Sequence, residues 1–125
     1  MEMREATYFI LAALQGEPRH GYAIMKFAID SSGGRVKLST GTLYTALDRL
    51  NTAGLIETDR QEVVDGRARR YYRLTDTGRS ALLTEAARLA EMSRVVTDHA
   101  ASADQPAAVE PSRTRRPGLT QVRPA

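Results

Sequence analysis

The sequence is 125 residues long, which is the size of one domain and too short for an enzyme with separate cofactor and substrate halves. Apolar residues make up 42% of it and aromatic residues only 6%, with no Trp. The chain can therefore bury a core. That core should consist mainly of Leu, Ala, Ile and Val, as in a small helical domain.

The net charge of +3 and the sequence pI of about 9.6 are compatible with binding a polyanion. No cysteine is present, which excludes disulfides, thiolate metal sites and cysteine nucleophiles and fits a reducing compartment. The longest apolar run, Tyr8–Leu14, is too short to cross a bilayer, and the charged residues ahead of it do not form a secretory signal. We therefore expect a cytoplasmic protein without a membrane segment.

Residues 101–125 differ in composition from the rest of the chain. They hold four of the five prolines and four arginines but almost no bulky apolar residues, which predicts a disordered tail. Residues 1–100 then carry a net charge of only +1. Any surface that binds a polyanion must therefore be a local patch.

Two helices are predicted first. Side chains that can face a core recur at positions 7, 10, 11 and 14, and Gly16 and Pro18 end this pattern, so residues 5–14 should form a helix. A second helix should begin near His20 and end at the Ser-Ser-Gly-Gly run of residues 31–34. Its pattern places on one apolar stripe the residues Tyr22, Met25 and Ile29, with Ile24 and Ala28 beside them.

The segment Arg35–Leu38 alternates basic and apolar residues, as an extended piece with one face inward does. Ser39 or Thr40 then offers an N-cap for a third helix. This helix should turn Leu43, Leu47 and Leu50 inward and end at Gly54, where a left-handed residue suits the C-cap.

A β-hairpin should follow, because residues 55–58 and 70–74 read as strands on either side of the turn dipeptide Asp65-Gly66. Thr75 can then cap a last helix that runs from Asp76 to about His99. Its apolar stripe has a 4-3-4-3 spacing. The stripe comprises Leu82, Ala86, Leu89, Ser93 and Val96, with Leu83 and Ala90 alongside.

Three helices followed by a hairpin predict a mainly α fold with a small β-hairpin, the winged helix-turn-helix, extended by a long C-terminal dimerisation helix. We place the DNA-binding domain at residues 1–75 and the dimerisation helix at residues 76–100. In such a fold the third helix enters the major groove of DNA and the hairpin lies along the backbone or the minor groove.

The candidate DNA contacts are polar residues around the third helix and the hairpin. Hydroxyl groups and free amides at a helix N-terminus suit phosphate oxygens, and arginines at a wing tip suit a narrow minor groove. The candidates are Arg35, Lys37, Ser39, Thr40, Thr42, Tyr44, Thr45, Arg49, Gly66, Arg67 and Arg69.

A structural interpretation exists for each of these groups. The Ser-Thr-Gly-Thr run can be a capping segment only, and Arg35 and Lys37 can be solvated charges on a small edge strand. The arginines of the hairpin can pair with Glu57, Asp59, Glu62 and Asp65 across the two strands. Both interpretations of the hairpin stay open at this point.

Several motifs, in this order and with this spacing, resemble those of the PadR family of winged-helix transcriptional regulators. The similarity covers about residues 5–83. The motifs are His20-Gly21-Tyr22, Gly33-Gly34, the run from Leu38 to Leu47, Leu50, Gly54-Leu55-Ile56 and the run from Arg69 to Gly78.

The resemblance implies a homodimeric repressor that leaves its operator when a small molecule or a stress signal acts. It implies DNA contacts by Thr40, Thr42, Tyr44 and Thr45 in the major groove, and by Gly66, Arg67 and Arg69 in the wing. It further implies that helix 76–99 packs on its equivalent in the partner and on the partner's first helix. The implied interface residues are Ile10, Leu82, Leu83, Ala86, Leu89, Ala90, Ser93 and Val96.

The chain departs from the family pattern at Thr45, where Pro or a basic residue is frequent, and at Asn51-Thr52, which replaces a charged pair. Only one helix follows the wing, as in the short subfamily, which implies an effector site at the dimer interface. No aromatic residue follows Tyr72, so the chain lacks the aromatic residues with which some members stack flat drugs.

Two other classes of function are a protein-binding module and an enzyme. The long helix can bind another protein, with the wing charges serving only as solvated groups. A hydrolase or transferase is disfavoured, because His20 and His99 lie on different elements and neither a phosphate-binding loop nor a metal-ligand spacing is found. We expect no enzyme activity, no metal and no cofactor.

Overall fold

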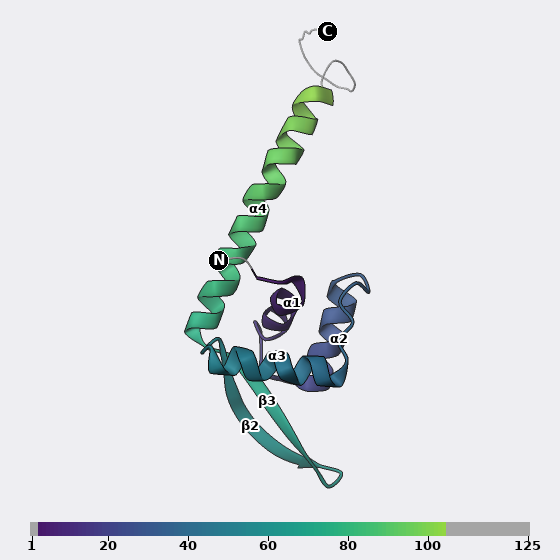
Figure 1. The fold of residues 1–125 in the computed structure, drawn as a ribbon, viewed down its shortest axis with the longest axis vertical. Coiled ribbons are helices and arrows are strands. Elements are labelled where there is room, and N and C mark those ends of the chain that lie inside the picture. The colour runs from purple at the N-terminus through teal and green to yellow at the C-terminus, as the bar shows by residue number, and fades with distance from the viewer. Residues whose placement is uncertain (1–2, 105–125) are drawn as a thin grey trace. The chain divides into compact units, whose positions relative to one another are not determined.

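A computed structural model describes residues 3–104, so the tail predicted for residues 101–125 lies largely outside the described residues. The elements are α1 (Glu5–Ala13), β1 (Arg19–His20), α2 (Gly21–Ser31), α3 (Thr40–Thr52), β2 (Ile56–Val64), β3 (Arg67–Leu74) and α4 (Asp76–Asp104) (Figure 1). The predicted order of three helices, a hairpin and a long last helix is confirmed, and the fold is a winged helix. Residues 101–104, which were predicted to belong to the tail, are the last residues of α4.

The core is built from one face of each of the first three helices together with the base of the hairpin. α1 buries Ile10 and Leu11, and α3 buries the predicted stripe of Leu43, Leu47 and Leu50. The stripe predicted for α2 is wrong at Tyr22, which is 70% exposed. Ile24 and Ala28 are buried instead, because the neighbouring elements cover the side of α2 that they occupy.

The sheet has three strands in the order β1-β3-β2, all antiparallel. One of its two edge strands is Arg19–His20, which pairs with Tyr72 and Tyr71 and was not predicted. Arg19 is held there because its Nε donates a hydrogen bond to the Ala13 carbonyl oxygen at 2.7 Å. The segment Arg35–Leu38 joins no strand in the described part of the chain. Within it Val36 is buried, and its N–H donates to Ser32 Oγ at 2.8 Å.

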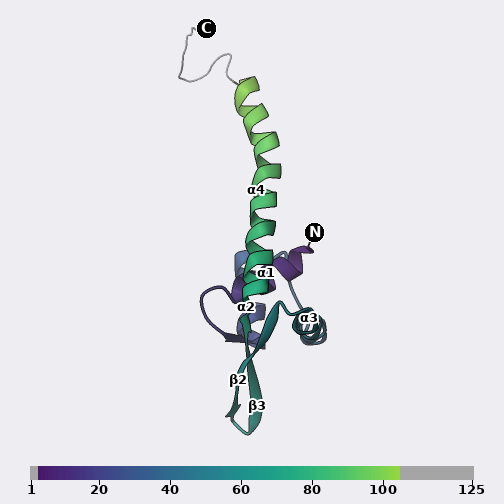
Figure 2. The same ribbon diagram turned by 90° about the vertical axis from the view of Figure 1, so that its left-hand side faces the viewer.

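β2 and β3 form a longer hairpin than predicted, paired from Ile56 and Leu74 at the base to Val64 and Arg67 at the tip. The turn residues Asp65 and Gly66 have φ of 53° and 78°, the pair of positive values that a two-residue type I′ turn requires. Figures 1 and 2 show this turn extending beyond α1, α2 and α3.

α4 begins against the loop that joins α3 to β2. The Thr75 hydroxyl donates to the Gly54 carbonyl oxygen at 2.6 Å and accepts the Gly78 N–H at 3.0 Å, so the predicted cap is confirmed. The chain divides into two compact units between Ala86 and Ala87. The first turns of α4 thus belong to the unit that contains the core, where Leu82 is buried.

Gly78 is required by this close approach, because a Cβ at position 78 would overlap the backbone carbonyl oxygen of Leu55. That oxygen already accepts the Thr75 N–H at 3.1 Å and cannot move freely. Gly78→Ala should therefore lower the free energy of unfolding by about 1–3 kcal/mol. Urea denaturation checks this, with Gly16→Ala as the control, since a Cβ at position 16 meets nothing within 4 Å. Equal midpoints for both variants would contradict the packing described.

Candidate nucleic-acid interface

The face of α3 opposite its buried stripe is polar and exposed. The helix begins at the N-cap Ser39, whose Oγ accepts the Thr42 N–H at 3.1 Å. A shallow depression on this exposed face is lined by Ser39, Gly41, Thr42, Thr45 and Arg49. Four of these five residues carry a hydroxyl group or a guanidinium group. The surface can therefore donate several hydrogen bonds to an anionic partner.

Tyr44 lies at the edge of this face and is 42% exposed. Its ring packs across the first residue of α2, because a Cβ on Gly21 would come within 2.5 Å of the Tyr44 hydroxyl oxygen. Tyr44 thus has two roles: it offers its edge to solvent and it sets how closely α3 approaches α2. The close packing explains why glycine stands at position 21, which sequence reasoning noted only as part of a motif.

The hairpin has two faces of different chemistry. One face continues the core, since Tyr72 and Leu74 are buried on it, and further along the same side of β3 lie Arg70 and Ala68. The other face carries Tyr71 together with Arg69 and Arg73 of β3.

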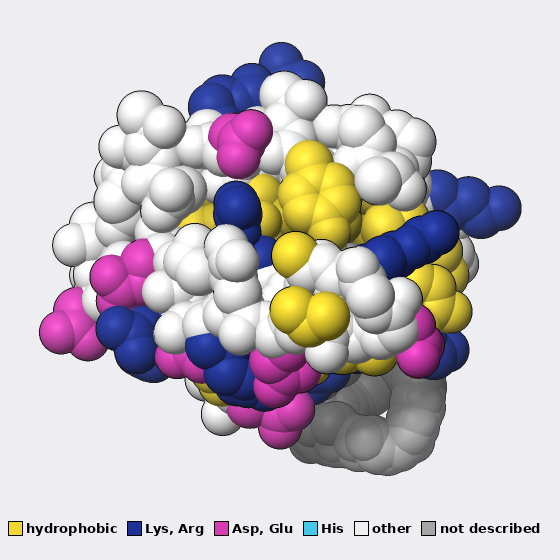
Figure 3. Space-filling view, turned by 90° about the horizontal axis from the view of Figure 1, so that it is seen from below, with side chains coloured by type: hydrophobic (Ala, Val, Ile, Leu, Met, Phe, Trp, Pro, Cys, Tyr) yellow, Lys and Arg dark blue, Asp and Glu magenta, His cyan; other side chains and the backbone are white. Residues whose placement is uncertain are grey.

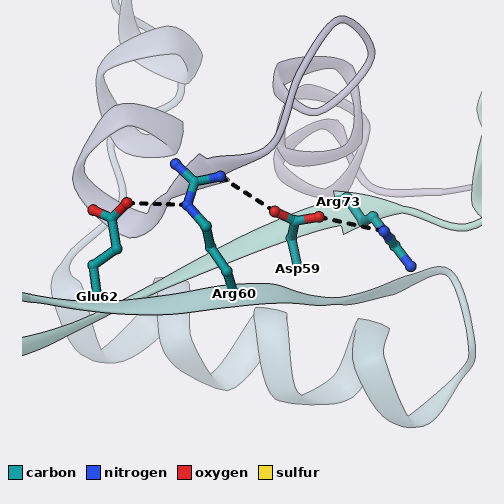
Figure 4. A network of polar contacts seen from close by, with 4 residues as sticks. All are labelled: Asp59, Arg60, Glu62 and Arg73. Carbon is teal, nitrogen blue, oxygen red and sulfur yellow. Dashed lines mark hydrogen bonds and ion pairs between the residues drawn. The ribbon is translucent and has the colours of Figure 1, made fainter.

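Ion pairs cross the second face (Figure 4). Arg73 contacts Glu57 at 2.8 Å and Asp59 at 3.3 Å, and Arg60 contacts Asp59 at 3.2 Å and Glu62 at 3.1 Å. The Arg60 guanidinium carbon also lies 3.9 Å from the centre of the Tyr71 ring. The hydrogen bond from Arg60 lowers the pKa of Glu62. Three of the hairpin's four carboxylates are therefore occupied within the hairpin itself, the structural alternative raised above.

His20 lies beside this network, with its ring centroid 5.3 Å from that of Tyr71. Burial lowers the pKa of His20, the positive charge of Arg69 lowers it further, and Glu62 opposes the shift. Among residues 3–104 no group of three His, Cys, Asp or Glu residues is placed to hold a metal ion. His20 thus packs on Tyr71 at the junction of β1 and α2.

Most of the predicted DNA contacts are exposed around α3 and the hairpin turn. These are Lys37, Ser39, Thr40, Thr42, Tyr44, Thr45, Arg49, Gly66 and Arg67. Figure 3 views the molecule from the hairpin end and shows charged side chains of both signs around a largely uncharged centre. The surface is therefore not a broad basic patch, and its individual basic residues must carry the attraction.

Two predicted contacts are not brought to this surface. Arg35 forms an ion pair with Glu5 of α1, a partner that lies 30 positions earlier in the chain and that the local pattern did not reveal. Arg69 is half-buried opposite Glu62, on the face of the ion-pair network. Arg70 is exposed on the other face, where strand alternation from Tyr72 predicts it, but it was not among the predicted DNA contacts.

The predicted dimer residues divide into two groups. Ile10 and Leu82 are 0% and 3% exposed within one chain, so their assignment to an interface is wrong; they form part of the protomer's own core. Along α4 the residues Leu83, Leu89 and Val96 are exposed apolar side chains, with Ala86, Ala90 and Ser93 also at least partly exposed. Sequence reasoning missed Met92 and Val95, which are 54% and 73% exposed.

None of the helices in residues 3–104 combines the length and the apolar character that crossing a bilayer demands. The three helices, the hairpin and the exposed polar face of α3 define a winged helix-turn-helix protein. The sequence profile of the transcriptional regulator PadR-like family matches residues 10–84. The chain therefore belongs to the PadR-like family of transcriptional regulators, as the sequence motifs had indicated.

Individual relatives agree with this assignment. Transcriptional regulator Rv3488 of Mycobacterium tuberculosis is 44% identical over 78 residues, which cover 62% of this chain and 59% of that regulator. A PadR family transcriptional regulator from Eggerthella lenta is similar with a TM-score of 0.61 and 27% identity over 74% of this chain and 78% of its own. Bacillus subtilis PadR in complex with operator DNA is similar with a TM-score of 0.58 and 26% identity over 65% and 46% of the two chains.

Because the pKa of His20 is lowered in the folded chain, the free energy of unfolding should depend on pH. As the pH falls below about 6.5 the unfolded chain binds a proton at this residue before the folded chain does. The free energy of unfolding should therefore fall as the pH decreases through that value, and His20→Gln, which cannot be protonated, should lose part of this dependence. Urea denaturation of both proteins between about pH 5 and about pH 7.5 measures the difference. Parallel curves would contradict the lowered pKa.

Proposed function

We propose that this protein is a DNA-binding transcriptional repressor that acts in the cytoplasm as a homodimer on a pseudo-palindromic operator. The observation that carries the proposal is the exposed polar face of α3, held outward by its buried leucine stripe in a chain of the PadR-like family. Release of the operator by a small molecule or a stress signal is part of the proposal. It is supported by the resemblance to the family alone.

The α3 surface suits DNA in two ways. The hydroxyl groups of Ser39 and Thr42 and the free amides of the first turn of α3 can bind phosphate oxygens, which would set the register of the protein on the duplex. Arg49 makes no ion pair within residues 3–104 and can donate two hydrogen bonds to a guanine edge. Thr45, at the centre of the exposed face, can contact a thymine methyl group.

The proposed dimer rests on the later turns of α4. Leu89, Met92 and Val96 recur at helical spacing and are 39%, 54% and 68% exposed. Burial of apolar side chains of this size would stabilise the protein, because transfer of apolar surface out of water is favourable. A second copy of the chain offers the same stripe and can cover it symmetrically. Such a dimer would present its two α3 helices about 34–36 Å apart, or a multiple of this distance, which matches a pseudo-palindromic site.

The DNA-binding proposal can be tested without knowing the operator. We would enrich duplexes from a random pool on the full-length protein, then titrate the enriched and a scrambled duplex by fluorescence anisotropy. Arg49→Ala should weaken binding to the enriched duplex on the order of tenfold, because it removes a base contact. Arg94→Ala, which removes the same charge from a residue paired with Glu91 on α4, should not. Failure to enrich any sequence would refute the proposal.

Two variants of α4 test the dimer, each of which introduces one aspartate. Leu89→Asp should yield a monomer in size-exclusion chromatography with light scattering, because the interface would have to bury an unpaired carboxylate. Ala87→Asp adds the same charge on the opposite side of the helix and should remain dimeric. Circular dichroism verifies that both variants stay folded. A dimeric mass for Leu89→Asp would exclude this interface.

A further inference from the structure

The hairpin's two faces are separated by an irregularity in β2. Thr58 pairs with Tyr72 and the next pair joins Arg60 to Tyr71, so Asp59 is an extra residue in the strand. This bulge reverses the alternation of β2 from that point on. Without it Glu62 would lie on the side of the buried Tyr72, which is the side that faces α3. With it Glu62 lies on the opposite face, opposite Arg69.

The strand residues on the face toward α3 beyond the bulge therefore include no carboxylate. Arg70 pairs across the strands with Gln61, and Ala68 pairs with Val63. Arg70 is exposed and forms no ion pair in the described part of the chain. By contrast, Glu57, Asp59 and Glu62 are on or beside the other face, where Arg60 and Arg73 neutralise them.

Arg70 lies on the side of the hairpin that carries the buried Tyr72. Burial raises the pKa of the Tyr72 hydroxyl, and the neighbouring guanidinium of Arg70 opposes this shift. Tyr44 and Asp48 of α3 raise the pKa of the same hydroxyl further, so both lie on the side of the wing that carries Arg70 and Tyr72. Asp48 is the one carboxylate among them, and it forms no ion pair with Arg70 within residues 3–104.

We propose that Arg70 is the strand residue of the wing that contacts the DNA backbone, and that Arg69 holds the opposite face of the hairpin and does not touch DNA. A duplex lying on the exposed edge of α3 would bring a phosphate to the exposed Arg70 guanidinium, which forms no ion pair within residues 3–104. On the opposite face Arg60 and Arg73 are already paired with carboxylates of the hairpin. This assignment rests on the proposed function, because it names the residue through which the wing would join the α3 surface.

The test compares two variants that each remove one positive charge, Arg70→Gln and Arg69→Gln. Affinity for the enriched duplex would be measured by anisotropy at several salt concentrations. Arg70→Gln should weaken binding on the order of tenfold and reduce the slope of log affinity against log salt by about 0.9, the loss of one phosphate contact. Arg69→Gln should keep the slope of the wild type. Arg70→Lys, which retains the charge, should restore the slope.

The outcomes separate the assignment from the proposed function. A reduced slope for Arg69→Gln with a normal slope for Arg70→Gln would overturn the assignment while DNA binding stands. An unchanged slope for both variants would likewise overturn it. A wild-type protein without salt-dependent, sequence-preferring binding would overturn the proposed function and the assignment together. Urea denaturation of each variant checks the fold, and the slope is a readout that partial unfolding does not imitate.

Discussion

Burial of the leucine stripe of α3 is the constraint on which the proposed surface depends. Leu43 and Leu47 are fully buried, and truncating a buried leucine of this kind typically costs about 2–5 kcal/mol, so α3 cannot rotate about its axis without losing much of the stability of the domain. The rotation of α3 decides which of its side chains reach solvent. Two contacts keep the helix in place. Near its start Tyr44 packs against Gly21, and just after its end the Gly54 carbonyl oxygen accepts a hydrogen bond from Thr75.

The ion pairs of the hairpin affect the distribution of charge more than the stability of the fold. These ion pairs are exposed, and such pairs are worth only about 0–1 kcal/mol each, so they contribute little to the stability of the fold. Their larger effect is on the distribution of charge. The bulge at Asp59 brings Arg60 and Glu62 to the face that carries Glu57 and Arg73, and so keeps Glu62 off the face of Arg70. A hairpin of nearly balanced charge thereby presents one positive face toward α3.

α4 combines two environments in one continuous helix. Its first turns complete the core, where Leu82 is buried and Gly78 allows the backbone to approach the loop after α3. Its later turns expose Leu89, Met92 and Val96, which a single chain leaves in contact with water. The burial of Leu82 shows that a regularly spaced apolar stripe need not form one interface. The first residues of this stripe pack in the protomer's own core, and the later residues are exposed.

The sequence by itself determined the features that depend on neighbouring residues: the helix periods, the caps at Ser39 and Thr75, and the turn at Asp65-Gly66. These are local because a cap or a turn needs only a few adjacent residues of the right chemistry. Tertiary structure alone decided the two-residue strand β1, the pairing of Arg35 with Glu5 and the bulge at Asp59. A strand of two residues has no period to detect, and ion pairs and strand register join residues far apart in the chain, so only packing selects among the alternatives.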